Sequence, residues 1–393
     1  MAEATPGAAG GPPRRHVSPA GHAAPAALAD ADDTLGADAA YRLLEQGTGL
    51  VWRGDFHNAR QLLQALGRRF ERRHARPGHA PRAGSTPAQV FEHQRRMQAS
   101  RVALLCRLLV PVEPGWRIAL KRAPDLAAAC AAALGPLDTP ALLPLRELQG
   151  LSGAWQWQLR GVPVPALATL LGGDARVHPH HGVFAPVRSE YVDLVARAPL
   201  PPAAAVAGAL DIGTGTGVLA AVLAARGVAD VTATDRDPRA LACARDNLAR
   251  LLPQQVVTVR QADLFNFSDA SAAPARPYGL VVCNPPWVPA PAEVGLDAAV
   301  YDPDSAMLRG YLAGLAAHLA PGGEGWLILS DLAEHLGLRS RAELRGWIQA
   351  AGLAILDRLD IRPTHRRTLD TADPLHRARS AEVTSLWRLG RAG

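Results

Sequence analysis

Leu210-Asp-Ile-Gly213-Thr-Gly215-Thr-Gly217-Val is a glycine-rich stretch that follows the short run Ala207-Gly-Ala and precedes the helix-prone residues Leu219 to Arg226. It therefore predicts a strand, a glycine turn and a helix, in that order. Glycines let the backbone approach a ligand closely, and the N-terminus of the helix presents N–H groups that no carbonyl of the helix accepts. This order is typical of a nucleotide-binding turn, so the stretch decides both the fold class and the place of the site.

The glycine spacing differs from that of a dinucleotide-binding turn. Such a turn has the pattern Gly-x-Gly-x-x-Gly, whereas here the third glycine, Gly217, comes one residue early and Val218 stands in the expected place. An NAD-dependent oxidoreductase is therefore an alternative that the spacing disfavours. Calorimetric titration with NAD would test this alternative, which predicts that NAD binds.

Two aspartates end the next two predicted strands. Asp235 closes Val231-Thr-Ala-Thr, and Asp263 follows the strand predicted from Gln255 to Val259. A carboxylate at the end of the second strand can accept hydrogen bonds from both ribose hydroxyls of a nucleoside. We expect Asp235 to do so, and we expect Asp263 to reach an adenine amine.

A second informative stretch, Asn284-Pro-Pro-Trp287, follows the apolar run Tyr278-Gly-Leu-Val-Val-Cys283 and therefore sits where a buried strand ends. Two prolines fix the backbone φ and remove two N–H donors, so nearby carbonyl oxygens stay available as acceptors. The Asn284 amide oxygen and the Pro285 carbonyl are placed to accept the two hydrogens of an –NH2 group. Trp287 offers a face on which a planar group can stack. The stretch predicts a site that holds a planar nitrogen while it is alkylated.

In order and spacing, these stretches resemble those of class I S-adenosylmethionine-dependent methyltransferases with an Asn-Pro-Pro-aromatic motif. Asn284-Pro-Pro-Trp-Val-Pro289 and Ala233-Thr-Asp-Arg-Asp-Pro-Arg-Ala-Leu241 look most like the HemK-type enzymes, which methylate glutamine in release factors. Methyltransferases of the small-domain class that act on ribosomal RNA, and adenine-specific DNA methyltransferases, are similar too. The resemblance covers roughly residues 175–390. The HemK pattern normally has Tyr where Trp287 stands.

The resemblance implies S-adenosyl-L-methionine as the cofactor and assigns residues to it. The implied catalytic residues are Asn284, Pro285, Pro286 and Trp287; the implied cofactor-binding residues are Asp211, Gly213, Thr214, Gly215, Gly217, Asp235, Arg236, Asp263, Leu264 and Asn284.

The implied reaction is N-methylation of a planar amide or amino nitrogen, with no metal and no covalent enzyme intermediate. We favour protein glutamine as the acceptor over an exocyclic amine of an rRNA or DNA base. A catalytically inactive methyltransferase fold that binds RNA is a further alternative, which a test for product formation would exclude.

From Leu210 onward, predicted strands alternate with helices, as a doubly wound parallel sheet requires. The last two predicted strands, Leu353 to Ile361 and Glu382 to Leu389, are expected to form the C-terminal antiparallel hairpin of the methyltransferase sheet. The fold class is therefore α/β, a Rossmann-like methyltransferase domain. We expect it to span residues 176–393.

The residues before this domain match no motif. We expect residues 1–37, which are rich in Ala, Gly and Pro, to form a disordered leader, and residues 38–175 to form a mainly helical domain that contributes to substrate recognition. Helical spacing predicts two helices joined by a turn between Asp38 and Leu66. The alternating segment Trp155 to Arg160 predicts a strand.

The chain has a net charge of +6, and Lys121 is its only lysine among 42 basic residues. Eleven arginines fall within residues 52–104, against Asp55, Glu71 and Glu92. This span is either a solvated face or a basic surface that binds an acidic or phosphate-rich substrate.

No apolar run approaches the roughly 18 residues that cross a bilayer, so we expect no membrane partner. Cys106, Cys130, Cys243 and Cys283 show no metal-ligand spacing, which favours reduced core cysteines in a cytoplasmic protein. Adjacent histidine side chains point apart, so the segment from His178 to His181 does not indicate a metal site either.

Overall fold

The computed structural model describes residues 4–5, 14–75, 81, 84–267, 276–291, 299–363 and 370–393. The chain divides into two compact units: unit 1 consists of Met1–Ser85 and Gln89–Gln156, and unit 2 of Thr86–Ala88 and Trp157–Gly393. This division comes earlier in the chain than the boundary at residue 175 that the sequence suggests. None of the helices in the described ranges is both long and apolar enough to cross a membrane.

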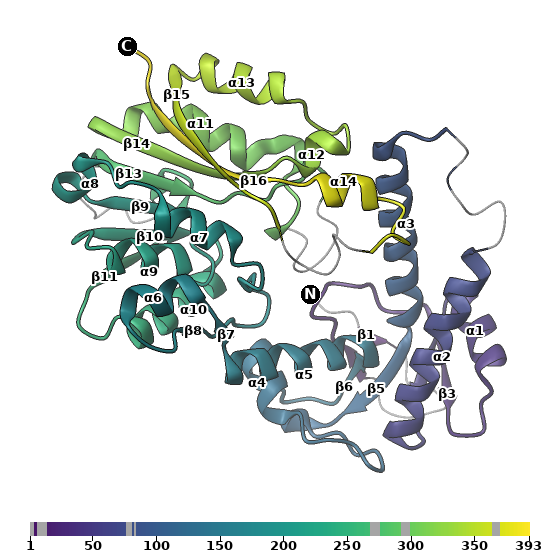
Figure 1. Cartoon of the computed structure of the whole chain (residues 1–393). Helices are drawn as coiled ribbons and strands as arrows, with labels where there is room; N and C mark the ends of the chain where they lie inside the picture. The colour runs from purple at the N-terminus through teal and green to yellow at the C-terminus, as the bar shows by residue number, and fades with distance from the viewer. Residues whose placement is uncertain are drawn as a thin grey trace. The chain divides into compact units, whose positions relative to one another are not determined.

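Unit 1 is built on a six-stranded sheet with the order β1-β2-β6-β5-β4-β3 (Figure 1). Its strands are β1 (Ala4–Thr5), β2 (Arg14–His16), β3 (Ala27–Ala31), β4 (Thr48–Trp52), β5 (Leu108–Val112) and β6 (Ala141–Pro144). Its helices are α1 (Ala37–Glu45), α2 (Phe56–His74), α3 (Pro87–Leu105), α4 (Ala127–Leu134) and α5 (Leu145–Arg160), with the division between the units falling within α5.

The main core of unit 1 lies on one face of this sheet. Leu50, Leu108 and Leu143 of three neighbouring strands pack there with Leu44 of α1 and Leu66 of α2. Helices hold more of the described residues of unit 1 than strands do, and the residue pattern does not predict the sheet.

Two expectations for the N-terminal part are wrong. Residues 14–37 are not a disordered leader, because β2 pairs with β6 and β3 pairs with β4; residues 1–3 and 6–13 lie outside the described residues. The segment from Trp155 to Arg160 is the end of helix α5 and not a strand. Leu145, Leu148 and Leu151 are buried on one side of that helix and set its register, whereas Trp157 is exposed.

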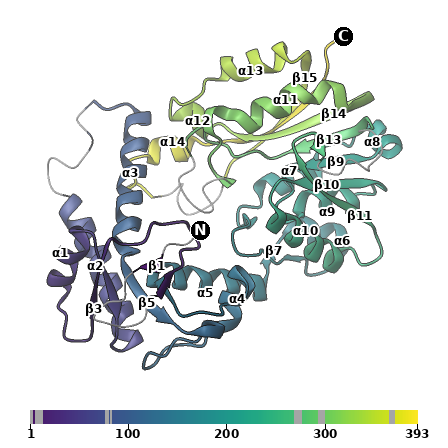
Figure 2. The same ribbon diagram turned by 180° about the vertical axis from the view of Figure 1, so that it is seen from behind.

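Unit 2 contains an eight-stranded sheet with the order β12-β11-β10-β9-β13-β14-β16-β15 (Figures 1 and 2). The strands are β9 (Ala209–Ile212), β10 (Val231–Asp235), β11 (Val257–Asp263), β12 (Asn266–Phe267), β13 (Tyr278–Cys283), β14 (Leu319–Ser330), β15 (Leu353–Ile361) and β16 (Thr384–Arg391); a separate two-stranded sheet consists of β7 (Val162–Pro163) and β8 (Arg176–Val177). The strands from β11 to β14 in this order run parallel, and β15 and β16 form the expected antiparallel pair.

Helices cover both faces of this sheet, so the domain is doubly wound. Successive residues of β13 point into different cores: Leu280 and Val282 pack on the face covered by α9, and Val281 and Cys283 on the face covered by α11. The helices of unit 2 are α6 (Pro165–Leu171), α7 (Glu190–Arg197), α8 (Pro202–Ala207), α9 (Val218–Ala225), α10 (Pro238–Leu251), α11 (Ala306–His318), α12 (Leu332–His335), α13 (Arg341–Ala350) and α14 (His376–Ala381).

The chain order changes direction on either side of β9. The strands β10 and β11 follow on one side of β9, and β13 and β14 follow on the other. In open α/β sheets, ligands bind outside the carboxyl ends of the strands at such a switch point. The ends of β9 and β13 therefore mark the position of the site.

Candidate functional site

The carboxyl ends of four adjacent strands bring the predicted site residues to one edge of the sheet. Ile212 pairs with Cys283 and with Thr234, and Asp235 pairs with Gln261. The glycine turn follows Ile212, and Asn284 follows Cys283. Asp235 ends β10, and Asp263 ends β11. The order β11, β10, β9, β13 thus lays the three predicted cofactor stretches beside the predicted acceptor stretch.

The glycine turn between β9 and α9 is fastened to the neighbouring strand β10. The Thr214 backbone N–H donates to the Thr234 carbonyl at 2.8 Å, and the Gly215 N–H donates to Asp235 Oδ2 at 3.0 Å. A Cβ on Gly215 would meet no atom within 4 Å in the described part of the chain. The backbone here is held in place while the space beside it stays open to a ligand.

Gly217 has a different reason to be glycine. Its φ is +81°, and a Cβ there would lie 3.2 Å from the Ala244 Cα of helix α10. A side chain would therefore strain the backbone and push α10 away from the turn. Gly217 serves close packing of the turn, which explains its conformation without a ligand contact.

Asp211 is a buried carboxylate under the glycine turn and is 1% exposed. Its Oδ2 accepts from the Thr214 hydroxyl at 2.6 Å and from the Ala220 N–H at 3.1 Å, whereas Oδ1 has no hydrogen-bond partner among the described residues. Burial raises the pKa of Asp211 to about 6, against the hydrogen bonds from Thr214 and Ala220, which lower it. A buried acid with one unpartnered oxygen is suited to a cationic ligand group.

Both carboxylate oxygens of Asp235 accept a hydrogen bond from the backbone, and each can accept another. Oδ2 accepts from Gly215 N–H, and Oδ1 accepts from the Asp237 N–H at 3.0 Å. A carboxylate has about four lone-pair positions, so each oxygen can accept one further hydrogen bond. Burial raises the pKa of Asp235, and the bonds from Asp237 and Gly215 oppose that shift.

The other predicted cofactor residues differ in how they are placed. Asp263 is exposed at the end of β11, and the Arg236 side chain is exposed after β10. Leu264 has a φ of +55°, which is strained for a branched side chain, and its side chain packs against Gly310 of helix α11. Packing therefore accounts for the Leu264 side chain.

At the end of β13, Asn284 is held by the aromatic residue of its own motif. The Trp287 indole N–H donates to Asn284 Oδ1 at 2.9 Å. The Trp287 ring is partly buried and packs against the cores on both faces of the sheet. The indole thus fixes the orientation of the amide, a contact that the sequence does not predict.

The start of α11 also contributes to this edge. Asp302 is buried and accepts from the Met307 N–H at 2.9 Å and the Leu308 N–H at 3.1 Å, so it caps the helix. A Cβ on Gly213 would come within 2.8 Å of the Met307 Cε. The sequence predicts a helix from Ser305 to Leu319, as found, and the Asp302-Pro303 pair just before it is an N-cap signal that could have pointed to Asp302.

Asn247 of α10 was likewise missed. It is fully buried; its Oδ1 accepts from the His178 N–H at 2.7 Å and its Nδ2 donates to the Thr216 carbonyl at 3.1 Å. The three nearby histidines do not share a neighbour. His178 Nδ1 forms a hydrogen bond with the Gln158 carbonyl, and His180 lies beside the Asp246 carboxylate. His181 Nδ1 is buried without a hydrogen-bond partner in the described ranges. Asn247 therefore ties the segment before α7 to the glycine turn.

Residues 174–335 match the methyltransferase small domain family. The chain is 39% identical over 151 residues to a release factor glutamine methyltransferase of Deinococcus radiodurans, covering 35% of this chain and 50% of that protein. It is 34% identical over 179 residues to a release factor glutamine methyltransferase of Cereibacter sphaeroides, covering 42% of this chain and 59% of that protein.

A third relative is a tRNA1(Val) (adenine(37)-N6)-methyltransferase of Serratia proteamaculans. It is 32% identical over 186 residues, which cover 46% of this chain and 68% of that protein. The chain thus spans between half and three fifths of the two glutamine methyltransferases and about two thirds of the tRNA enzyme.

Proposed function

Because the chain belongs to the class I S-adenosylmethionine-dependent methyltransferases, we propose that unit 2 transfers a methyl group from S-adenosyl-L-methionine to a planar amide or amino nitrogen. The observation that carries the proposal is the single sheet edge at which the glycine turn, Asp235 and Asn284 meet. Cofactor residues and acceptor residues follow adjacent strands there.

In this proposal the cofactor lies across the ends of β11, β10 and β9. Asp235 accepts the ribose hydroxyls with the lone pairs that Gly215 and Asp237 leave free. The unpartnered Asp211 Oδ1 faces a ligand that carries both an ammonium and a sulfonium charge. Gly213, Thr214 and Gly215 supply the backbone beside it, and exposed Asp263 reaches the adenine amine.

Asp235→Ala is expected to weaken cofactor binding by about 1–3 kcal/mol, because it removes a charged hydrogen-bond acceptor from the site. Calorimetric titration of the full-length protein with S-adenosylmethionine measures this directly. Asp237→Ala is the matched control, since that side chain caps α10 by accepting from the Arg239 N–H. An affinity equal to that of the unaltered protein would show that the ribose is held elsewhere.

The acceptor nitrogen lies against Asn284 and Pro285. Its lone pair attacks the methyl carbon in line, the carbon–sulfur bond breaks with its electron pair going to sulfur, and the sulfonium becomes a neutral thioether. The nitrogen then loses a proton to solvent. Carbonyl oxygens that accept the N–H groups favour the positive charge that develops, and the two prolines add no competing donor.

Trp287→Phe is expected to lower kcat about 2–10-fold with little change in cofactor affinity. Phenylalanine keeps an aromatic face but cannot donate to Asn284 Oδ1, so the amide loses one net hydrogen bond of about 0.5–1.5 kcal/mol. Single-turnover rates measure the loss. Equal rates for the two proteins would mean that the indole N–H does not position Asn284.

We propose protein glutamine as the acceptor. The residues around Asn284 and Asp235 resemble the HemK type, and the two release factor methyltransferases are more similar in sequence to this chain than the Serratia enzyme is. The amino group of adenine has the same planar geometry, so the tRNA enzyme supports the base as the second candidate.

The test uses pure full-length protein, methyl-labelled cofactor and lysate from a strain that lacks the protein. Protease-sensitive, RNase-resistant label on glutamine is the expected result. RNase-sensitive label would replace glutamine by a base, and absence of label transfer would contradict the proposed reaction as a whole.

We further propose that unit 1 helps to bind the acceptor and that the protein acts in the cytoplasm, where release factors and tRNA are found. Within the arginine-dense span, Arg69, Arg73 and Arg101 pair with acidic residues of the same unit. Arg60, Arg68 and Arg72 are exposed on α2 and are the candidate contacts. Acceptor affinity should then fall steeply between about 50 and 200 mM salt.

A further inference from the structure

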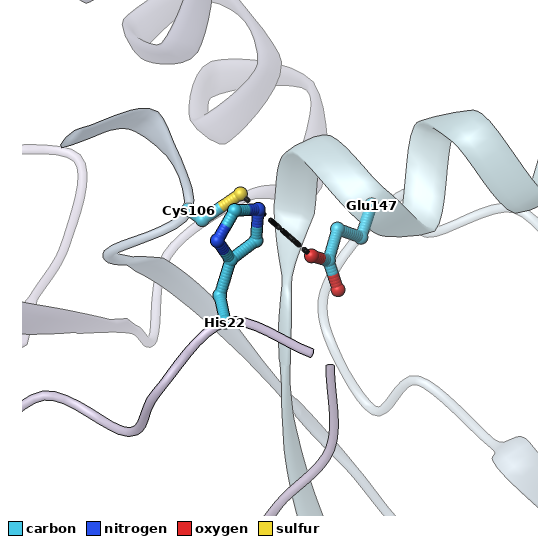
Figure 3. Close-up of side chains that lie close together, drawn as sticks. All are labelled: His22, Cys106 and Glu147. Atoms are coloured by element: carbon cyan, nitrogen blue, oxygen red, sulfur yellow. Dashed lines mark hydrogen bonds and ion pairs between the residues drawn. The ribbon is translucent and has the colours of Figure 1, made fainter. Parts of the chain in front are cut away.

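Three side chains of unit 1 that methyl transfer does not use converge in one cluster (Figure 3). His22 lies in the loop between β2 and β3, Cys106 lies between α3 and β5, and Glu147 lies in the first turn of α5. The ligand atoms of these three residues all lie within 4.8 Å of one another. Imidazole, thiol and carboxylate are the three side-chain groups that bind zinc.

Two separations within the cluster are compatible with one small ion. His22 Nε2 is 3.6 Å from Glu147 Oε1, and the Cys106 thiol donates to the same oxygen across 3.9 Å. Zinc bond lengths of about 2.0–2.3 Å with tetrahedral angles place neighbouring ligand atoms roughly 3.3–3.6 Å apart. Both separations come within a few tenths of an ångström of that value, and the N–O separation is long for a hydrogen bond.

Two polar atoms of the cluster are buried without a hydrogen-bond partner among the described residues, His22 Nε2 and Glu147 Oε2. The Glu147 side chain is 8% exposed. Its other oxygen, Oε1, accepts from the Ser18 hydroxyl at 2.8 Å, and Ser18 Oγ in turn accepts from the His22 N–H at 2.8 Å. The hydrogen bonds thus orient the carboxylate, and His22 Nε2, 3.6 Å from Oε1, is the atom facing the cluster that is left unsatisfied.

We propose that His22, Cys106 and Glu147 bind a zinc ion, with water in the fourth position. The thiolate and the carboxylate together balance the two positive charges of the ion, so the buried cluster is neutral. Sulfur and nitrogen ligands favour zinc over magnesium or calcium. The ion would join the segment before β3 to α5 and to the start of β5.

The test strips the full-length protein with a chelator, dialyses it, and reloads it with Zn²⁺ or Co²⁺. The expected results are one equivalent of zinc by elemental analysis and, with cobalt, a near-ultraviolet thiolate charge-transfer band. Full-length protein that holds no zinc after dialysis, or whose cobalt spectrum lacks the thiolate band, would overturn the proposal.

Variants locate the site. Cys106→Ser should abolish the thiolate band, whereas Cys130→Ser, which changes a buried cysteine outside the cluster, should retain it. Glu147→Gln keeps an oxygen that accepts from Ser18 but loses the charge, so zinc affinity should fall at least about tenfold. Circular dichroism and cofactor titration show whether each variant is folded. Equal zinc affinity in folded Glu147→Gln and unaltered protein would show that Glu147 is only a polar contact of Ser18 and would refute the assignment.

Discussion

Replacing Asn284 by alanine is expected to lower kcat/KM for methyl transfer by about 10²–10³, the loss found when one preorganised polar group is removed from a developing charge. The affinity for S-adenosylmethionine should stay within about threefold, because the proposed work of the amide is on the acceptor. Trp287 holds that amide oxygen at 2.9 Å, so the acceptor meets an oxygen whose direction is already set.

Rates under single-turnover conditions and calorimetric cofactor affinities test this together. Asn58→Ala is a control, since Asn58 is a half-buried amide on α2 of unit 1 that donates to Asp33 Oδ1. Turnover retained by Asn284→Ala would remove Asn284 from the reaction. A loss of cofactor affinity comparable to the loss of rate would instead move Asn284 from the acceptor to the cofactor.

The second large effect concerns stability, and it comes from Asp211. Its pKa is about 6 in the folded protein, mainly because of burial, and about 3.9 in an unfolded chain. At a pH between these two pKa values, the folded state binds more protons than the unfolded state. The free energy of unfolding therefore falls as the pH rises from about 4 to about 6. Above about pH 6 the full cost is present, about 3 kcal/mol for a shift of roughly two units.

Asp211→Asn is therefore expected to flatten this part of the stability curve. Its amide oxygen can still accept from Thr214 and Ala220, but no charge is buried. Urea unfolding without cofactor at about pH 4.5 and 7.5 should show that the variant gains stability relative to the unaltered protein as pH rises, by up to about 3 kcal/mol. A difference in stability that stays constant across this range would show that Asp211 does not titrate there. In the proposed function, the same substitution weakens cofactor binding, since it removes the charge that meets the cation.

The methyltransferase unit was predictable because its strands are buried on both faces. A strand such as Tyr278–Cys283 sends alternate residues into two cores, so it reads as one continuous apolar run that is easily found. The carboxyl ends of such strands meet at one edge. Asp235 and Asn284 could therefore be placed near each other from the sequence alone.

The sheet of unit 1 was not predictable in the same way. β4 lies in the glycine-containing stretch that the spacing predicts to be a turn, and β2 and β3 lie where composition predicts disorder. These strands are short, and β2 takes its partner from far along the chain, with Arg15 opposite Ala141. Local residue patterns carry no signal for such pairings.

The details of the sites depend on side chains that only the fold brings together. No motif spacing links Asn247 to Thr216 or Trp287 to the exact direction of the Asn284 amide. Cysteine spacing likewise indicated no metal site, because the neighbours of Cys106 come from two other segments of the chain. Sequence patterns predict ligands that are close in the chain and miss those assembled across it.

The pairing of β2 with β6 also has a consequence for biosynthesis. Arg15 leaves the ribosome long before its partner Ala141 is made, and at about 5–20 residues per second the roughly 126 residues between them take roughly 6–25 s to synthesise. During that interval β2 has β1 as a partner but lacks β6, which joins it to the rest of the sheet. Slow codons placed between these two strands would lengthen that interval, whereas slow codons after Pro144 would give unit 1 time to close before unit 2 emerges.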